Sequence, residues 1–560
     1  MADMRREQWN DAAIRVNQIG FSSTGLSKTF SSQVVSGSFE VFDDDTNECV
    51  FAGTTSPAVE DEAAGVRVSL GRLDGLDMPG RYRIRMKNGV ESPVFTIAER
   101  PYQAVKLALL RNFYFQRCGM ELEQRYAGPW KHAACHLDLG IIHGDDPSIR
   151  RKTAGGWHDA GDYGKYIVAA AKAVADLMLA YEAYPAAFQE STDIPESGNG
   201  VPDILNETRY ELEWMLLMQR EDGAVYHKLT TYEFPGLHVM PEDDTAALVF
   251  SPVSFTATGT FAASMAMASR VFAPFDEAFA ANCRKAAERA WQWMESTESF
   301  ERTSFRNPRD VKTGEYGDSN VIDEQYWAAA ELYRLTGDRT YLMQADKLAL
   351  SGSFPLCELG WRDVGGYGTI ALLYALRDAG DRSAMELRER LTEQWITRAD
   401  ELLDLSKRNG FGVSLTLDQY KWGSSMIVMN NGMHLLIAAG LVRDSDRHQS
   451  YLEAAAQQWH YLLGCNVLGI CYVTGFGSHS VKHPHHRPSI ADSVPHPVPG
   501  IVAGGPNSGL NDTAAAALLI GRAPMACYID HEDSYSTNEN TIYWNSPAVY
   551  VAAALDCLNR

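Results

Sequence analysis

Two aspartates lie three residues apart in a glycine-rich tract, residues 155–166, with the sequence GGWHDAGDYGKY. Asp159 and Asp162 come just before an apolar segment with helical periodicity, and the glycines allow the backbone to approach a ligand closely. Two neighbouring carboxylates can hold one water molecule between them while one of them takes its proton. Either aspartate could instead cap the helix that follows, so the pair alone leaves both interpretations open.

A third carboxylate, Glu539, lies in the tract YIDHEDSYSTNENTIYWNSP at residues 528–547. It stands between two asparagines and close to Tyr543 and Trp544. Burial beside aromatic rings raises the pKa of a carboxyl group, which keeps the group protonated and able to act as an acid. A solvated loop glutamate is the alternative for this residue taken alone.

Soft metal ligands surround the aspartate tract in the sequence: Cys118, Cys135, His136 and His158. Their spacing is not that of a zinc ribbon, so buried free cysteines are the alternative interpretation.

Hard oxygen donors gather in the tract DSNVIDE at residues 318–324, and Asp363 follows in a glycine-rich segment. Calcium takes roughly six to eight such oxygens. An acidic helix N-terminus, favoured by the helix dipole, is the alternative. A further acidic tract, MPEDDT at residues 240–245, fits either a substrate contact or a second ion.

The elements that position these residues change in type near residue 100. Strictly alternating runs at residues 66–70, 82–86 and 94–97, separated by turn residues, predict a small β-sandwich. Beyond Pro101 the apolar residues recur with helical spacing, and no strand-like runs alternate with the helices. We therefore expect a mainly α protein with two domains, 1–100 and 101–560, whose long loops carry function.

Composition excludes several classes of partner. The formal net charge is −22, whereas a nucleic-acid-binding protein needs a basic surface. The most apolar segment, residues 167–180, contains Lys172 and Asp176, so we expect a buried helix in place of a membrane span. The N-terminal residues show no apolar signal segment, which predicts a cytoplasmic protein as written, or a secreted one if a signal has been removed. Nine scattered cysteines fit a reducing compartment.

Three tracts together resemble glycoside hydrolase family 9. The GGWHDAGDYGKY tract resembles the family's catalytic-base motif, and YIDHEDSYSTNENTIYWNSP is similar to its second signature. The tract GFGSHSVKHPHHRPS at residues 475–489 resembles the first signature, with His479 at a position where another residue is usual. The VNQIGF tract at residues 16–21 resembles the immunoglobulin-like domain found in one branch of the family.

The resemblance implies a fold and a set of roles. The fold is a six-hairpin (α/α)6 barrel preceded by an immunoglobulin-like β-sandwich. Asp162 is then the general base, Asp159 positions the attacking water and Glu539 is the general acid. His485 and Arg487 bind the sugar, and Tyr543 is a further candidate because it lies four residues after Glu539.

The resemblance also implies metal ions. In the branch with the immunoglobulin-like domain, Cys118, Cys135, His136 and His158 correspond to a structural zinc site, which has no open position for catalysis. The acidic tract resembles a calcium site of the family, and the ligands implied are Ser319, Asp323, Glu324 and Asp363.

The function implied is inverting hydrolysis of β-1,4-glucosidic bonds in cellulose-type glucans or cello-oligosaccharides. The alternative within the family is an exo-acting β-glucosaminidase or β-glucosidase on short oligosaccharides. A different class is a non-catalytic carbohydrate-binding protein, which the presence of both Asp162 and Glu539 disfavours. We expect a monomer whose partner is a β-linked oligo- or polysaccharide, with no nucleic acid and no membrane.

Overall fold

The structure is a computed structural model that describes residues 13–34, 36–298 and 302–558. Residues 1–12, which include part of the tract behind the localisation prediction, lie outside the described residues. The chain forms two compact units, which are described separately. One contains the described residues up to Asn112 together with those from Ala399 onward, and the other is Phe113–Arg398.

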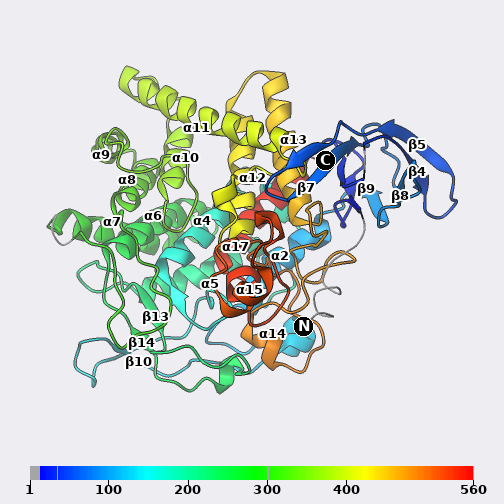
Figure 1. The fold of residues 1–560 in the computed structure, drawn as a ribbon. Coiled ribbons are helices and arrows are strands. Elements are labelled where there is room, and N and C mark those ends of the chain that lie inside the picture. The colour runs from blue at the N-terminus through cyan, green and yellow to red at the C-terminus, as the bar shows by residue number, and fades with distance from the viewer. Residues whose placement is uncertain (1–12, 35, 299–301, 559–560) are drawn as a thin grey trace. The chain divides into compact units, whose positions relative to one another are not determined.

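A two-sheet β-sandwich begins the first unit (Figure 1). Its sheets have the strand orders β1-β3-β7-β6 and β2-β9-β8-β4-β5. The strands are β1 (Ile14–Arg15), β2 (Phe21–Ser22), β3 (Thr29–Ser32), β4 (Ser38–Asp43), β5 (Cys49–Thr54), β6 (Val59–Asp61), β7 (Val66–Arg72), β8 (Gly80–Met86) and β9 (Phe95–Ala98). The alternation that predicted β8 is confirmed, because Tyr82, Ile84 and Met86 point into a shared apolar core with Phe30 and Phe39.

Helices dominate the rest of the chain, as the spacing of apolar residues predicted. They are α2 (Gln103–Phe115), α3 (Gln124–Ala127), α4 (Ile167–Ala183), α5 (Asp203–Leu217), α6 (Phe255–Phe272), α7 (Glu277–Ser296), α8 (Ile322–Thr336), α9 (Arg339–Ala349), α10 (Gly365–Ala375), α11 (Arg382–Arg408), α12 (Ser424–Leu441), α13 (Ser445–Leu462), α14 (Arg487–Ala491), α15 (Thr513–Leu519), α16 (Tyr535–Asn538) and α17 (Ile542–Leu558). Short 3-10 turns lie at Gly128–Trp130, Pro185–Phe188, Pro241–Asp243, Leu417–Gln419 and Pro524–Ala526. Among the described residues, no helix is both long enough and apolar enough to cross a membrane.

Helix α4 is buried along almost its whole length, as expected for residues 167–180. Its two fully buried charged residues neutralise each other, since Lys172 Nζ lies 2.6 Å from Asp176 Oδ2. The hydroxyl of Tyr367 donates to the other oxygen of Asp176 at 2.7 Å. Pairing of this kind is what allows charge inside a soluble helix bundle.

Some elements were not predicted from the sequence. A five-stranded sheet, β11-β10-β14-β13-β12, lies among the loops of the second unit. Its strands are β10 (Gly140–Ile142), β11 (Arg150–Arg151), β12 (Lys165–Tyr166), β13 (Lys228–Thr230) and β14 (Val249–Phe250). Strands of two or three residues are too short to show alternation, so the sequence did not reveal this sheet, whose pairings are antiparallel except for that of β10 with β14.

Helix α10 was missed because its sequence, GGYGTIALLYA, begins with glycines and has no polar face. Gly368 allows α10 to pack closely against α8, and Gly365 and Gly366 allow it to pack against residues 354–359. A Cβ atom at Gly368 would lie 2.6 Å from the Tyr326 ring, closer than any real side-chain contact. Tertiary packing therefore decides this helix, and intrinsic propensity does not.

The sandwich is tied to helices of its own unit by buried polar contacts. Thr29 Oγ1 donates to Gln457 of α13 at 2.8 Å, and Asn17 meets His460 of the same helix at 3.0 Å. At the junction between β9 and α2, Lys106 Nζ lies 2.7 Å from Asp556 Oδ2, and both side chains are 1% exposed. Arg100 also reaches Asp556, at 3.0 Å.

We predict that Asp556→Ala lowers the free energy of unfolding by about 3–5 kcal/mol, because it leaves the Lys106 charge buried and unpaired. Chemical denaturation monitored by circular dichroism measures the effect. The control is Asp404→Ala, which removes a largely exposed carboxylate on α11 and should change stability little. Equal stability of the two variants would contradict the prediction.

Candidate active site

The aspartate tract forms a closed loop before β12 and α4. The amide of Asp159 donates to Gly164 O at 2.9 Å, and the amide of Gly164 donates to Asp162 Oδ1 at 2.6 Å. The loop starts at Gly156, whose φ is +73° and whose Cβ would lie 2.7 Å from the Trp214 ring. Helix α4 begins after Tyr166 without a side-chain cap, so the helix-cap interpretation of the aspartates is wrong.

Asp159 is 1% exposed and is held by one hydrogen bond from a distant segment. The hydroxyl of Tyr316 donates to its Oδ2 at 2.5 Å. Its Oδ1 has no hydrogen-bond partner among the described residues. Burial raises the pKa of Asp159 well above its ordinary value, the Tyr316 hydrogen bond opposes this, and the charge of Asp162 adds to it.

Tyr316 itself has an unusual backbone. Its φ is +48°, in the left-handed region that a bulky residue rarely occupies. Its ring packs against Tyr166 at 4.6 Å between centroids and against Trp361 at 4.8 Å. Such strain persists only where the surroundings hold it, and it places the hydroxyl on Asp159. No sequence pattern marked Tyr316.

Glu539 belongs to the other unit and lies between α16 and α17. It is 8% exposed, and its carbonyl oxygen accepts from the amide of Gly504 at 2.9 Å. The preceding Asn538 fixes the loop through contacts with Tyr528 Oη at 2.5 Å and Asp530 Oδ1 at 3.1 Å. The largely buried position agrees with the environment expected of a carboxyl acid, in contrast to a solvated loop residue.

His485 and Glu539 are neighbours, because their backbones form an isolated parallel β-bridge. Burial lowers the pKa of His485 to about 4, which keeps the ring neutral at neutral pH. Its Nδ1 must donate to Glu532 O, 2.5 Å away, because a carbonyl oxygen can only accept. Its Nε2 is therefore left as an acceptor, a suitable partner for a sugar hydroxyl.

Arg487 and Tyr543 are buried. Arg487 is 6% exposed at the first position of α14. Tyr543 is 6% exposed in α17 and packs edge-on against Trp544, with 6.0 Å between ring centroids. No contact given by the structure tests their predicted roles with sugar.

An exposed aromatic side chain lies near His485 in the same unit. Trp422 is 45% exposed, and its ring lies 5.1 Å from that of Tyr535, which in turn lies 6.0 Å from His485. An exposed indole anchored in this way presents a flat face to a sugar ring. The sequence contained Trp422 and Tyr535 but could not show that they pair.

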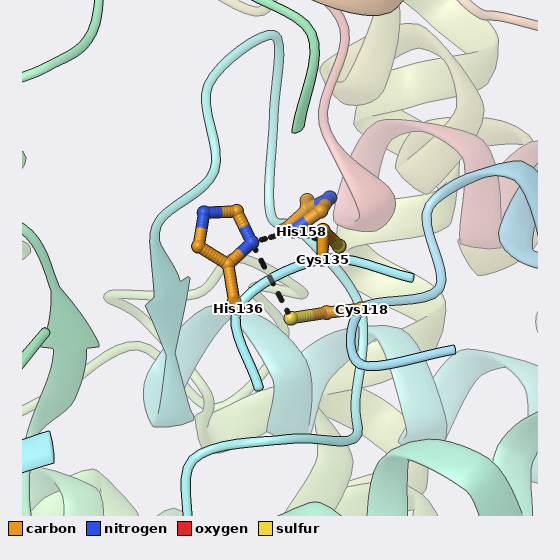
Figure 2. A group of neighbouring side chains, drawn as sticks. All are labelled: Cys118, Cys135, His136 and His158. Atoms are coloured by element: carbon orange, nitrogen blue, oxygen red, sulfur yellow. Dashed lines mark hydrogen bonds between the residues drawn. The ribbon is translucent and has the colours of Figure 1, made fainter. Parts of the chain in front are cut away.

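The four soft ligands converge (Figure 2). All four side chains are buried, and their ligand atoms lie within 4.8 Å of one another. His136 Nδ1 lies 3.3 Å from His158 Nε2 and 3.9 Å from Cys118 Sγ. Donors bound to one tetrahedral ion at roughly 2.0–2.3 Å are spaced in this way, so the geometry fits a metal.

Electrostatics in this cluster also fit a cation. A hydrogen bond from Cys135 lowers the pKa of Cys118 well below its ordinary value. Burial lowers the pKa of His158 to about 4. Burial also acts to lower the pKa of His136, but hydrogen bonds to Asp244 and Cys118 outweigh it and raise the pKa to about 9. A bound metal ion would take the place of the shared protons.

Asp244 orients one of these ligands and was not predicted to do so. Its Oδ2 lies 3.4 Å from His136 Nε2, which leaves Nδ1 facing the cluster. A carboxylate behind a metal-binding histidine fixes its tautomer and ring direction. The acidic tract at residues 240–245, which the sequence left undecided, therefore has this structural role at Asp244.

Acidic side chains gather at the N-terminus of α8. Asp318, Asp323 and Glu324 are buried, and oxygens of all three have no hydrogen-bond partner among the described residues. Burial raises the pKa of Asp318 to about 6 and that of Asp323 to about 7, and the charge of Asp363 adds to both. Ser319 is exposed.

The acidic cluster is more open than the Cys118 cluster. Among the described residues, the ligand atoms of Cys118, Cys135, His136 and His158 all lie within 4.8 Å of one another, whereas the acidic side chains do not come as close together. Asp318, which was not in the predicted ligand set, contributes a buried oxygen to the acidic cluster.

Residues 102–552 match the profile of glycosyl hydrolase family 9, and residues 10–91 match that of the cellulase N-terminal ig-like domain. The chain belongs to glycosyl hydrolase family 9. It is a glycoside hydrolase, and the predicted (α/α)6 barrel with an immunoglobulin-like β-domain before it is confirmed.

Relatives match over nearly the whole chain. A cellodextrinase from Butyrivibrio fibrisolvens is 35% identical over 97% of this chain and 99% of its own length. A xyloglucan-specific endo-beta-1,4-glucanase from Bacteroides ovatus is 35% identical over 98% of this chain and 94% of its own length.

Solved structures agree. An endoglucanase from Alicyclobacillus acidocaldarius superposes with a TM-score of 0.89 at 42% identity, covering 97% of this chain and 99% of that one. A zinc-binding triple mutant of the family 9 endoglucanase J30 gives a TM-score of 0.87 at 31% identity, covering 95% of this chain and 99% of that one.

We predict that Tyr316→Phe lowers kcat about tenfold with little change in melting temperature, because Asp159 loses the hydrogen bond that orients it. Steady-state kinetics on a soluble cello-oligosaccharide measures the effect. The control is Tyr333→Phe, a half-buried tyrosine of α8. If both variants keep the wild-type kcat, the contact with Asp159 does not contribute to turnover.

Proposed function

We propose that this family 9 enzyme hydrolyses β-1,4-glucosidic bonds of short, soluble β-glucans by a single displacement at the anomeric carbon. The observation that carries the proposal is the buried loop in which Asp159 and Asp162 lie together, one of them held by Tyr316. This arrangement supports a mechanism in which two carboxylates hold the attacking water. A carboxylate that attacked the sugar directly would need no second carboxylate beside it.

In this proposal Asp162 removes the proton from the attacking water. Asp159 orients that water through Oδ1, the oxygen that Tyr316 does not occupy. Glu539 gives its proton to the departing glycosidic oxygen, for which its largely buried position is suited. His485 and Arg487 bind hydroxyl groups of the sugar.

The substrate class rests on the relatives and on one surface feature. Cellodextrinase and xyloglucan-specific endoglucanase are the activities of two relatives that match over nearly the whole chain. The exposed face of Trp422 beside Tyr535 offers a platform for a glucose ring. Product analysis on cellohexaose, carboxymethyl-cellulose, xyloglucan and chitosan oligomers separates endo from exo action and glucose from glucosamine.

We predict that the first product released from a β-linked glucan is the α-anomer, because one displacement inverts the configuration. Proton NMR before mutarotation detects it.

Glu539→Gln should lower turnover by about 10²–10⁴ on unactivated substrates, since the leaving group then lacks its proton donor.

Glu532→Gln is the matched control, because Glu532 lies in the same tract and makes its contact with His485 through the backbone carbonyl. The control should retain near wild-type turnover. An initial β-anomer would contradict the roles of Asp159 and Asp162, and a Glu539→Gln variant with more than about a tenth of wild-type activity would contradict its role as the acid.

Two metal ions belong to the same proposal. A structural zinc would be held by Cys118, Cys135, His136 and His158, with no position open for catalysis. A calcium ion would be held by Asp323, Glu324, Asp363 and Ser319, together with Asp318. Its charge would offset the burial, and the smaller mutual repulsion, that raise the pKa values of these carboxyl groups.

We predict about one zinc and one calcium per chain by elemental analysis, and a lower melting temperature after chelation, because ligand binding stabilises the folded state. Cys118→Ser with Cys135→Ser should remove the zinc alone. Asp323→Asn should remove the calcium alone.

The control pair is Cys283→Ser and Asp338→Asn, which change a buried cysteine of α7 and the capping aspartate of α9. Both should keep full metal content. Unchanged zinc in the double cysteine variant, or unchanged calcium in Asp323→Asn, would show that the corresponding site is assigned wrongly.

A further inference from the structure

A buried lysine lies behind the aspartate loop and takes no part in the mechanism proposed so far. Lys228 begins β13, pairs with Tyr166 of β12, and is fully buried. Its ammonium group donates to Thr313 Oγ1 at 2.9 Å and to Gly314 O at 2.6 Å. It also lies over the ring of Tyr166, 5.6 Å from the centroid. Keeping an ammonium group out of water is costly, so its position calls for a physical reason.

The contacts of Lys228 fix the segment that carries Tyr316. Gly314 is two residues before Tyr316, whose hydroxyl meets Asp159. The same segment is held from other directions, since Asn307 Nδ2 donates to Thr313 O at 2.7 Å and His227 Nε2 lies 3.1 Å from Glu315 O. Lys228 donates three hydrogen bonds to Thr313 and Gly314, just before the residue Tyr316 whose backbone is in the left-handed region.

The charges that face Lys228 come from two elements packed against it. Asp162 lies on the aspartate loop and Glu315 on the segment of Tyr316, and both attract the ammonium group. Glu315 is already paired with Arg306 at 2.8 Å, and the arginine side chain is exposed. Asp162 also feels the neighbouring Asp159. Because Coulomb attraction is mutual, the lysine charge favours the ionised form of Asp162 as much as Asp162 favours the charged lysine.

We infer that Lys228 is a positioning residue for hydrolysis: its hydrogen bonds to Thr313 and Gly314 fix the segment whose Tyr316 orients Asp159, and its positive charge favours the ionised form of Asp162. The inference rests on the proposed role of Asp162 as the base. Burial lowers the pKa of Lys228 to about 7, and the two carboxylates limit this fall. Below that pH the lysine is charged, so its charge is present throughout the acidic range in which a carboxylate base takes up its proton.

The pH profile of kcat/KM tests this, because its acid limb reports the ionisation of the base in the free enzyme. Lys228→Met keeps the length of the side chain and removes the charge. It should move the acid limb to higher pH by about one unit, as expected when a nearby positive charge is lost. It should also lower kcat about tenfold with little change in KM, because Asp159 is less well oriented.

Two further variants make the comparison specific. Lys312→Met removes an exposed lysine of the same segment and should leave the profile of the wild type unchanged. Lys228→Arg keeps the charge and should leave the acid limb near its wild-type position. An acid limb in Lys228→Met that coincides with those of the wild type and Lys312→Met would overturn the inference, whatever happens to melting temperature.

A measurement that does not need the Lys228 variants to fold covers the remaining case. In enzyme labelled with 13Cε-lysine, the Lys228 signal should titrate at lower pH in Asp162→Asn than in the wild type, because the lysine loses an attracting charge. Equal titration would overturn the electrostatic link. Full activity of Asp162→Asn would instead overturn the proposed base, and the two failures are distinct because the lysine titration is read without turnover.

Discussion

Charge held out of water is the constraint on which the second unit depends. A carboxylate or ammonium group that is buried without a partner costs several kcal/mol, so each such group requires an opposite charge, hydrogen bonds or a cation nearby. Lys172 and Asp176 meet this requirement by pairing, and the acidic cluster at α8 meets it only in part. Asp159 is an intermediate case, with one oxygen bonded and the other left open. In the proposed mechanism, that open oxygen is the one that orients the attacking water.

The aspartate loop is held from two sides by segments that also carry candidate metal ligands. His158, next to Asp159 in the chain, lies in the Cys118 cluster. On the other side, Tyr316 reaches Asp159 and is followed two residues later by Asp318 of the acidic cluster. A structural ion at either place would therefore limit the movement of Asp159, to which the proposed mechanism gives the task of positioning one water molecule.

Much of this arrangement could be predicted from the sequence, and the limits have physical causes. Alternation along β8 records one buried face, and the length and apolar character of residues 167–180 indicate a buried helix, so both elements could be predicted from the sequence. The four soft ligands were found because cysteine and histidine are rare and chemically distinctive. Tyr316, Asp244 and Lys228 were missed because their roles arise from hydrogen bonds with residues 85 or more positions away or from backbone conformation, and neither leaves a local pattern. Helix α10 was missed because its packing against α8 requires glycines that hide its helical character.

The contact between Lys106 and Asp556 spans 450 residues of sequence. On the ribosome, the helix that contains Lys106 leaves the exit tunnel long before its partner is synthesised. Until α17 emerges, the lysine has to remain in water, so α2 cannot reach its final environment while the chain is growing. Vectorial synthesis thus delays the closing of this unit until α17 has been made, well after the strands of the β-sandwich are complete.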